Sequence, residues 1–253
     1  MGKILVNCNG VTTMTEINKF NSAFSTLQLQ GISENAAEKL CIYHENLTEW
    51  NKYMNLTGNT DFDDAFVRHY WDSFAPLSLP VWDNVTNVID VGTGAGFPGL
   101  VLAILKPNLQ ITLLDSLKKR LLFLEHVAKE TGVSNVNFVH ARAEDGGNNP
   151  MYRERFDIAL ARAVAPLSVL CELVLPFAKV KGKMLAYKGP LAIQEMEDAK
   201  NAIFTLGGAK PSYFHVPMPE NSEYERFLVC IEKRRNTPRY YPRKAGTPSK
   251  NPL

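Results

Sequence analysis

The chain has 253 residues, of which 45% are hydrophobic and 21% are charged, with a net charge of only +2 at pH 7, and this predicts one main α/β domain with a sizeable core. No stretch approaches the roughly 18 uncharged apolar residues of a membrane span, and the first residues lack the pattern of a secretory signal, so we expect a cytoplasmic protein without a membrane partner. The four cysteines are far apart and do not have zinc-site spacing, so we expect reduced thiols and no metal.

Helical periodicity dominates the first third of the chain. Buried-type side chains recur at spacings of three and four residues through residues 37–51, and Gly58 follows the end of this pattern. A further helix is predicted over residues 62–77. We therefore expect residues 1–84 to form a helical cap in front of the main domain.

From residue 85 the pattern changes to short apolar runs that alternate with helical segments. Strands are predicted over residues 87–91, 110–115, 135–141, 156–164, 183–189, 211–216 and 226–232. Helices are predicted over residues 97–106, 116–132, 166–179 and 191–206. This alternation predicts a doubly wound, mostly parallel seven-stranded sheet, and the last two strands are expected to be antiparallel because no helix separates them. We assign residues 85–235 to this domain.

A glycine-rich turn follows the first predicted strand in the segment NVIDVGTGAGFPGL, residues 87–100. In an open parallel sheet, ligands bind beyond the carboxyl ends of the strands, at the point where the strand order reverses, and this turn is predicted to lie there. Glycines let the backbone turn tightly and let a ligand approach it closely. The turn is therefore a candidate cofactor site, and two classes of cofactor fit its spacing.

A dinucleotide is the first class. Gly94, Gly96 and Gly99 have the spacing G-x-G-x-x-G, and Asp115 follows about 20 residues later, as the ribose-binding acid of such a site does. However, Gly92 already ends the strand, and no residue set for hydride transfer follows. An NAD(P)-dependent oxidoreductase is therefore retained as the alternative enzyme class.

The whole segment DVGTGAG instead resembles the glycine turn of the S-adenosylmethionine-dependent methyltransferases. That cofactor carries a sulfonium cation in place of a pyrophosphate, so an acid such as Asp90 beside the turn is favourable. The resemblance implies that Asp115 accepts hydrogen bonds from the ribose hydroxyls, and that Ala143 and Glu144 in HARAED lie beside the adenine. Phe97 is placed either to cover the cofactor or to pack in the core.

An ordered series of motifs makes the resemblance more specific. DVGTGAGFPGL, LLDSLKKRLLFLE, HARAED, FDIALARAVAPL and RRNTPRYYPRKAGTPSKNPL, with NLTGNTDFDDAFVRHYWDS upstream, together resemble the bacterial 16S ribosomal RNA guanine-N7 methyltransferase family, RsmG type, also called glucose-inhibited division protein B. The resemblance implies methyl transfer from S-adenosylmethionine to a guanine of 16S rRNA in the small ribosomal subunit. The cofactor-binding residues that it implies, with one taken from the wider methyltransferase pattern, are Gly92, Phe97, Asp115, Ala143, Glu144 and Arg162.

The residue chemistry is compatible with a ring-nitrogen acceptor. Guanine N7 has an in-plane lone pair at neutral pH, so no proton has to be removed first, and we assign no general base. The Asn/Asp-Pro-Pro-aromatic tetrapeptide of exocyclic-amine methylation is absent from ARAVAP after the fourth strand, and neither Cys171 nor Cys230 lies at a strand end, where a cytosine-C5 enzyme needs its nucleophile. Arg162 is expected to face the cleft and hold the cofactor, guanine O6 or a phosphate, unless it makes a structural ion pair.

Basic residues are concentrated at the C-terminus, since residues 233–253 hold seven basic side chains and no acidic one. Residues 236–253 are expected to form a basic tail that neutralises RNA phosphates, with Tyr240 and Tyr241 stacking on unpaired bases. A solvated terminus without a binding role is the alternative. We expect no DNA partner and a monomeric protein.

Three further residues are expected on the RNA side of the cleft. Arg68 and His69 belong to the predicted cap, and Lys188 lies in YKGP at the end of the fifth predicted strand. Ordinary positions on a helix face are the alternative for the two cap residues. A non-catalytic RNA-binding protein that uses the cofactor only as a ligand is the second alternative function.

Overall fold

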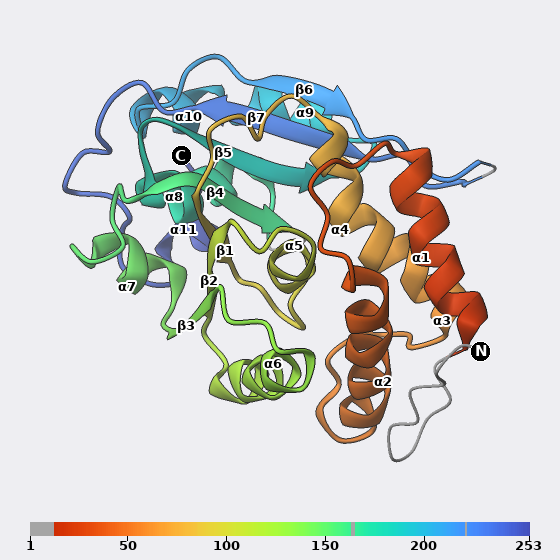
Figure 1. Cartoon of the computed structure of the whole chain (residues 1–253). Helices are drawn as coiled ribbons and strands as arrows, with labels where there is room; N and C mark the ends of the chain where they lie inside the picture. Colours follow the sequence, from red (N-terminus) through yellow and green to blue (C-terminus); the bar gives the residue numbers. More distant parts are fainter. Residues whose placement is uncertain (1–12, 163–164, 221) are drawn as a thin grey trace.

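The computed structural model describes residues 13–162, 165–220 and 222–253, so predictions for residues 1–12 and for the end of the fourth strand at residues 163–164 lie outside the described chain. Within it, one sheet is formed by the strands β1 Asn87–Val91, β2 Gln110–Asp115, β3 Val136–His140, β4 Phe156–Arg162, β5 Ala178–Lys188, β6 Ser212–His215 and β7 Phe227–Glu232. Its strand order is β3-β2-β1-β4-β5-β7-β6 (Figure 1).

The sheet confirms the predicted fold class. β1 is parallel to β2 and to β4, β4 is parallel to β5, and β7 runs antiparallel to both β5 and β6. The strand order reverses between β1 and β4, because the chain moves outward from β1 through β2 to β3 and then returns to the other side of β1. The carboxyl ends of β1, β2 and β4 therefore form the edge at which doubly wound proteins bind ligands.

The helical cap is also present in the described residues. It consists of α1 Met14–Thr26, α2 Ala36–Met54, α3 Phe62–Ala65, the π-helix η1 Phe66–Trp71, α4 Asp72–Phe74 and the 3₁₀-helix η2 Ala75–Ser78. Figure 1 shows these helices gathered on one side of the molecule, next to α5. The helix predicted over residues 62–77 is thus real, but it changes type three times along its length.

The other helices cover the two faces of the sheet. They are α5 Gly99–Leu105, α6 Lys118–Thr131, α7 Ala143–Asn148, α8 Leu167–Val174, the 3₁₀-helix η3 Leu175–Phe177, α9 Ala192–Asp198, α10 Lys200–Thr205 and α11 Thr247–Lys250. The sequence pattern did not predict α7 and α11. No helix in the described residues is long and apolar enough to span a bilayer.

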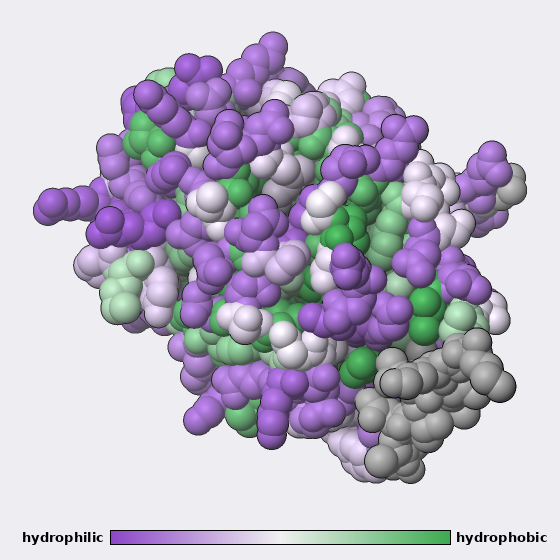
Figure 2. All heavy atoms as spheres, viewed as in Figure 1, coloured by the Kyte–Doolittle hydropathy of each residue, from purple (hydrophilic) through white to green (hydrophobic). Residues whose placement is uncertain are grey.

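Two apolar cores lie on opposite faces of the sheet, because successive strand residues point to opposite sides. Val88 packs with the cap, α5 and α6, whereas its neighbour Ile89 packs with α8, α9 and α10. Every residue of β1 after the first is buried, as expected for a strand covered on both faces. On the face seen in Figure 1 most of the visible surface is hydrophilic, and apolar side chains show in separate small patches (Figure 2).

The C-terminal segment packs closely against α7 and α8. Glu172, only 1% exposed, accepts hydrogen bonds from the backbone N, Nε and Nη2 of Arg243 at 2.7, 2.9 and 2.6 Å. Arg153 donates to the carbonyl oxygens of Thr237 and Tyr241 at 2.7 and 2.8 Å. The segment expected to act as a tail therefore contributes directly to the packing of the α/β domain.

A buried lysine fixes the start of this segment. The ammonium group of Lys233 donates to Leu175 O and Thr237 Oγ1, both at 2.7 Å, and lies 3.5 Å from a carboxylate oxygen of Glu154. Burial lowers the pKa of Lys233 to about 8, although Glu154 acts in the opposite direction. The lysine thus links the end of β7 to η3 and to the C-terminal segment through bonds that satisfy its polar head.

The ion pair between Glu172 and Arg243 provides a test of this packing. The substitution Glu172→Gln should lower the free energy of unfolding by about 3 kcal/mol, because it leaves a largely buried guanidinium without its counter-charge. Glu197→Gln is the matched control, since Glu197 pairs with Lys200 and both side chains are exposed, so the loss should stay below about 0.5 kcal/mol. Urea unfolding measures both. Equal losses would show that the C-terminal segment is not held by this pair.

Candidate active site

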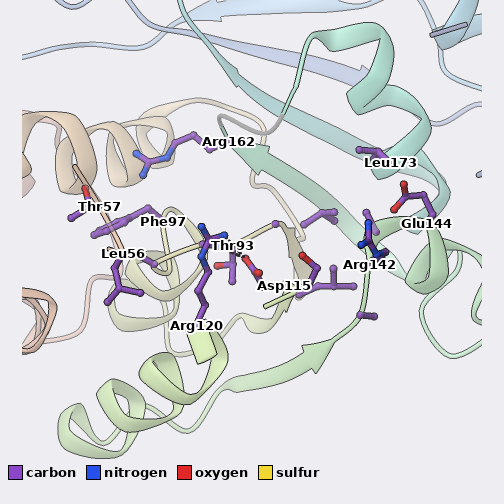
Figure 3. A pocket seen from close by; sticks show the side chains of 18 of the residues that line it. Leu56, Thr57, Thr93, Phe97, Asp115, Arg120, Arg142, Glu144, Arg162 and Leu173 are labelled. Atoms are coloured by element: carbon purple, nitrogen blue, oxygen red, sulfur yellow. Dashed lines mark hydrogen bonds and ion pairs between the residues drawn. The ribbon is translucent and has the colours of Figure 1, made fainter. Parts of the chain in front are cut away.

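A cavity of 510 Å³ opens at the carboxyl ends of β1, β2 and β4. The turn after β1, the end of β2 and the loop after β3 form its floor and walls, Arg162 at the end of β4 contributes a basic side chain, and the cap closes one side with Leu56, Thr57 and His69. Figure 3 shows Phe97, Thr57 and Arg162 at one end of the cavity and Arg142, Glu144 and Leu173 at the other, with Asp115 between them.

A buried carboxylate fixes the turn after β1. Asp90 Oδ2 accepts a hydrogen bond from Thr93 Oγ1 at 2.8 Å and another from the backbone N of Gly99 at 2.9 Å. Asp90 is 0% exposed, and its second oxygen, Oδ1, has no hydrogen-bond partner among the described residues. Burial raises the pKa of Asp90 to about 6, and the two hydrogen bonds act in the opposite direction. The first amide of α5 is therefore already occupied by an acid of the protein itself.

The glycines of the turn have two different surroundings. Gly92, with φ of +76°, and Gly94 line the cavity. A Cβ at Gly96 would lie 2.5 Å from Tyr43 Oη, and a Cβ at Gly99 would lie 2.4 Å from Leu113 Cδ2. Gly96 and Gly99 thus allow the cap and the sheet to pack closely, and they do not face a ligand.

This arrangement disfavours the dinucleotide alternative. In that site the glycines let the backbone approach a pyrophosphate, which binds at the N-terminus of the following helix. Here two of the three glycines of the G-x-G-x-x-G spacing face protein atoms, and the Gly99 amide is bound to Asp90. A pyrophosphate would also be repelled by the charged form of that buried acid.

The end of β2 carries the acid predicted to bind the ribose. Asp115 lines the cavity, although its carboxylate is 3% exposed. Its oxygens accept from the backbone N of Gly94 at 2.9 Å and of Leu117 at 2.8 Å, and Arg120 Nη1 lies 3.4 Å away. Each carboxylate oxygen can accept two bonds, so Asp115 can hold the turn and still accept from a ligand.

The loop after β3 forms the other end of the cavity. Arg142, Ala143 and Glu144 line it, and the last two are residues that the resemblance implies beside the adenine. Glu144 Oε1 accepts a hydrogen bond from the backbone N of Gly246 at 2.9 Å. The C-terminal segment therefore reaches the cavity wall and holds one of its carboxylates.

An aromatic stack lies at the end of the cavity nearest the cap. Phe97 is 5% exposed, and its ring stacks on Tyr43 at 5.2 Å and on His69 at 4.9 Å between centroids. His69 Nε2 lies 2.7 Å from Thr57 Oγ1. Burial and the charge of Arg162 lower the pKa of His69 to about 4, so the ring is neutral at physiological pH. Phe97 thus both packs in the core and lines the cavity.

Arg162 also reaches this end of the cavity. Its guanidinium carbon lies 5.3 Å from the Phe97 ring centroid, and Nη1 donates to Asp72 Oδ2 at 2.9 Å and to the carbonyl oxygen of Arg68 at 3.1 Å. Asp72 is 4% exposed. The arginine therefore has both the cleft position and the structural ion pair, which the sequence presented as alternatives.

Two of the predicted RNA-side residues lie outside the cavity lining. Arg68 pairs with Asp64 at 2.6 Å, and about half of its side chain is exposed. Lys188 is buried, and its ammonium group donates to Glu195 Oε2 at 2.6 Å and to Ala165 O at 2.8 Å. The charge of Lys188 is thus neutralised by Glu195 of α9, the helix that follows β5, whereas Arg68 remains accessible to solvent.

Several cavity residues were not singled out from the sequence. Thr57 follows α2 and lies next to His69, and Arg120 and Arg142 place two further guanidiniums near Asp115 and Glu144. Their motifs, NLTGN, KKR and HARAED, belong to the series that carried the family resemblance. Among the described residues, no three His, Cys, Asp or Glu side chains gather in a way that could hold a metal ion.

Comparison with known proteins points to one family. A family model described as rRNA small subunit methyltransferase G matches residues 36–222. A Brevibacillus brevis protein named Ribosomal RNA small subunit methyltransferase G is 48% identical over 229 residues, which cover 90% of this chain and 96% of the relative. A protein of the same name from Lactobacillus delbrueckii subsp. bulgaricus is 45% identical over 241 residues, or 94% of this chain and 96% of the relative.

A solved structure shares the fold. A predicted O-methyltransferase from Agrobacterium tumefaciens superposes with a TM-score of 0.51 at 16% sequence identity, covering 66% of this chain and 82% of the other. At this low identity the likeness concerns the arrangement of the sheet and helices alone.

The close contact at Gly96 generates a prediction about cofactor binding. Gly96→Ala should weaken the binding of S-adenosylhomocysteine at least about tenfold, because the backbone is at φ +102° and a methyl group would displace the Tyr43 hydroxyl at 2.5 Å. Gly132→Ala is the matched control, since Gly132 ends α6 at φ +62° with no atom within 4 Å of the added Cβ. Calorimetric titration should show unchanged affinity in the control, and unchanged affinity in both variants would contradict the role of Gly96.

The raised pKa of Asp90 predicts a dependence of stability on pH. Since its folded-state pKa of about 6 lies above the ordinary value of 3.8, the protonated form stabilises the fold below about pH 4, and this contribution is lost as the pH rises through 6. Asp90→Asn does not titrate, so it should gain about 2 kcal/mol relative to the wild type between about pH 4 and pH 8.

Urea unfolding at the two pH values measures this difference. Asp157→Asn is the control. Burial is the largest single influence on Asp157 and raises its pKa, but the hydrogen bonds from Lys179, Thr86 and Asn87 together lower it to about 2. Its difference from the wild type should stay nearly constant over the same range. A constant difference for Asp90→Asn as well would show that the Asp90 carboxyl is ionised throughout.

Proposed function

The chain belongs to the rRNA small subunit methyltransferase G family, and from this membership we propose that it transfers the methyl group of S-adenosylmethionine to N7 of a guanine in 16S ribosomal RNA. The matches are to the family that the ordered motifs predicted. We further propose that the protein acts in the cytoplasm, on the small ribosomal subunit or its RNA. One observation carries the proposal most directly, namely a cavity at the strand-order reversal whose glycine turn is held by acids of the protein.

The residues of the cavity fit this cofactor. An adenosine has ribose hydroxyls that donate to a carboxylate, and Asp115 has acceptor capacity beyond its two backbone bonds. Gly92 and Gly94 give the backbone an open surface on the cavity side. Ala143, beside Glu144, offers a small side chain where a flat base can lie. These are the residues that would hold the cofactor, together with Phe97 and Arg162.

The charges near Phe97 suit a cationic donor. When bound, S-adenosylmethionine supplies an electrophilic methyl group on a sulfonium centre. An uncompensated cation in the cavity would repel that centre, but Asp72 neutralises Arg162 at 2.9 Å and His69 is held neutral by burial. The aromatic face of Phe97 adds a surface with which a cation interacts favourably.

The guanine that accepts the methyl group has to be oriented, and it does not have to lose a proton. Guanine N7 attacks through a lone pair, so a residue that removes a proton is unnecessary, and neutral His69 with its Nε2 near Thr57 Oγ1 is not required as a base. Arg162 can donate to guanine O6 while N7 remains free for attack. Holding the two reactants in line and excluding water then account for the catalysis that these residues provide.

The substrate must present its guanine outside a helical stack. The cavity lies between the cap and the sheet edge, and a base inside a duplex cannot reach such a recess without being turned out. Single-stranded loops of RNA supply such bases at the lowest cost. Lys244 and Lys250 of the C-terminal segment are exposed, and Gly246 between them is bound to Glu144 of the cavity wall, so these two lysines can meet phosphates near the cavity.

Methyl transfer to defined RNA substrates tests the proposal. Labelled S-adenosylmethionine is incubated with the protein and either naked 16S rRNA or intact small subunits from a strain that lacks the gene, and the modified nucleoside is identified by mass. We expect one label per RNA, on guanine and at N7. Label on another base or on a guanine amine would overturn the N7 assignment. Binding of S-adenosylhomocysteine without any transfer to either substrate would favour a non-catalytic RNA-binding protein.

A further inference from the structure

A cluster of arginines lies where the cap meets the connection between β6 and β7. The guanidinium carbons of Arg68 and Arg226 lie 4.7 and 5.6 Å from the centroid of the Tyr224 ring. Trp71 Nε1 donates to Pro217 O at 2.7 Å and so ties this connection to η1. Figure 1 shows the connection reaching from the top of the sheet toward the cap helices. We call Arg68, Tyr224 and Arg226 the arginine rim.

The arginine rim is joined to the cavity through a buried carboxylate. Asp72 Oδ1 lies 3.3 Å from Arg226 Nε, while its Oδ2 accepts from Arg162 Nη1 at 2.9 Å. The same Arg162 donates to the carbonyl oxygen of Arg68. A Cβ at Gly189, just past the end of β5, would lie 4.0 Å from Arg226 Nη1. The rim therefore lies at the carboxyl edge of the sheet, directly beside the end of the cavity that holds Phe97 and Arg162.

Exposure of the arginines increases from the cavity outward. The side chains are 14% exposed for Arg162, 27% for Arg226 and 49% for Arg68. The three guanidiniums are paired with only two carboxylates, Asp72 and Asp64, which leaves one positive charge in excess. That excess is reachable from solvent on Arg226 and Arg68 and is shielded at Arg162.

Hydrogen-bond donors of the rim remain available. Among the described residues, neither Nη1 nor Nη2 of Arg68 and not Nη2 of Arg226 donates a hydrogen bond. A guanidinium that lies over an aromatic ring keeps its N–H edge free, and that edge matches two oxygens of a phosphate. Glu223 and Glu225 flank Tyr224 and are exposed, and among the described residues neither carboxylate forms an ion pair with Arg68 or Arg226.

We propose that the arginine rim binds a phosphodiester of the substrate RNA next to the target guanine, and that Asp72 positions the rim relative to Arg162. The inference rests on the proposed function, because it takes RNA as the substrate. The rim fixes the RNA backbone at the mouth while the guanine enters toward Phe97. Tyr224 and Arg226 thereby become substrate-binding residues, and Asp72 becomes a positioning residue.

The rim is tested with small subunits from a strain that lacks the gene. Arg226→Gln and Arg68→Gln should each raise KM for these subunits about tenfold and reduce the slope of log affinity against log salt by about 0.7 to 0.9, the value for one lost phosphate contact. kcat and the affinity for S-adenosylhomocysteine should change less than about twofold. Arg155→Gln, which changes the same charge at the amino end of β4, is the matched control and should leave KM and slope unchanged.

Variants of the ring and of Asp72 separate binding from folding. Tyr224→Phe keeps the aromatic face and should keep the wild-type KM, whereas Tyr224→Leu should raise it. Asp72→Asn should raise KM and lower kcat together, because it disturbs Arg226 and Arg162 at once. Identical KM and salt slope in Arg226→Gln and Arg155→Gln would overturn the rim as a phosphate site. A wild-type protein that binds S-adenosylhomocysteine but methylates no ribosomal RNA would instead overturn the proposed function, and the RNA ligand of the rim with it.

Discussion

The hydrogen bonds from Thr93 and from the amide of Gly99 to the carboxylate of Asp90 fix the geometry on which the site depends. They fold the chain back on itself immediately after β1 and occupy the first amide of α5. Since that amide would otherwise attract an anion, the turn is left suited to a ligand that brings no phosphate to this point. The burial of Asp90 raises its pKa, which means that the charged carboxylate is destabilised at the position where it shapes the turn.

The helical cap packs against the glycine turn and forms the remaining wall of the cavity. Tyr43 donates a hydrogen bond to the carbonyl of Ala95 and occupies the space beside Gly96, so α2 and the glycine turn fit directly against each other. The π-helix η1 then brings His69 onto the Phe97 ring, and π-helical turns are found frequently at functional sites. The cavity is therefore an interface between the cap and the sheet edge, and the cap is part of the site.

Much of the fold and of the cavity follows from local sequence patterns. The alternation of apolar runs and helical periods predicted the sheet and placed the glycine turn at its ligand-binding edge, whereas the family resemblance implied Gly92, Asp115, Glu144 and Arg162, which all line the cavity. Long-range pairing could not be predicted in this way. The partners of Lys188 and of Arg243 are acids on other elements, and no spacing in the sequence reveals that Glu195 and Glu172 neutralise them. The short helices α7 and α11 were missed because one or two turns give too little periodicity.

The most direct test of the central claim is a calorimetric comparison of ligands on the wild-type protein. We expect S-adenosylhomocysteine to bind with one molecule per chain, and NAD and NADP to give no heat under the same conditions. Binding of either dinucleotide in competition with S-adenosylhomocysteine, or no binding of S-adenosylhomocysteine at all, would contradict the account of the turn after β1.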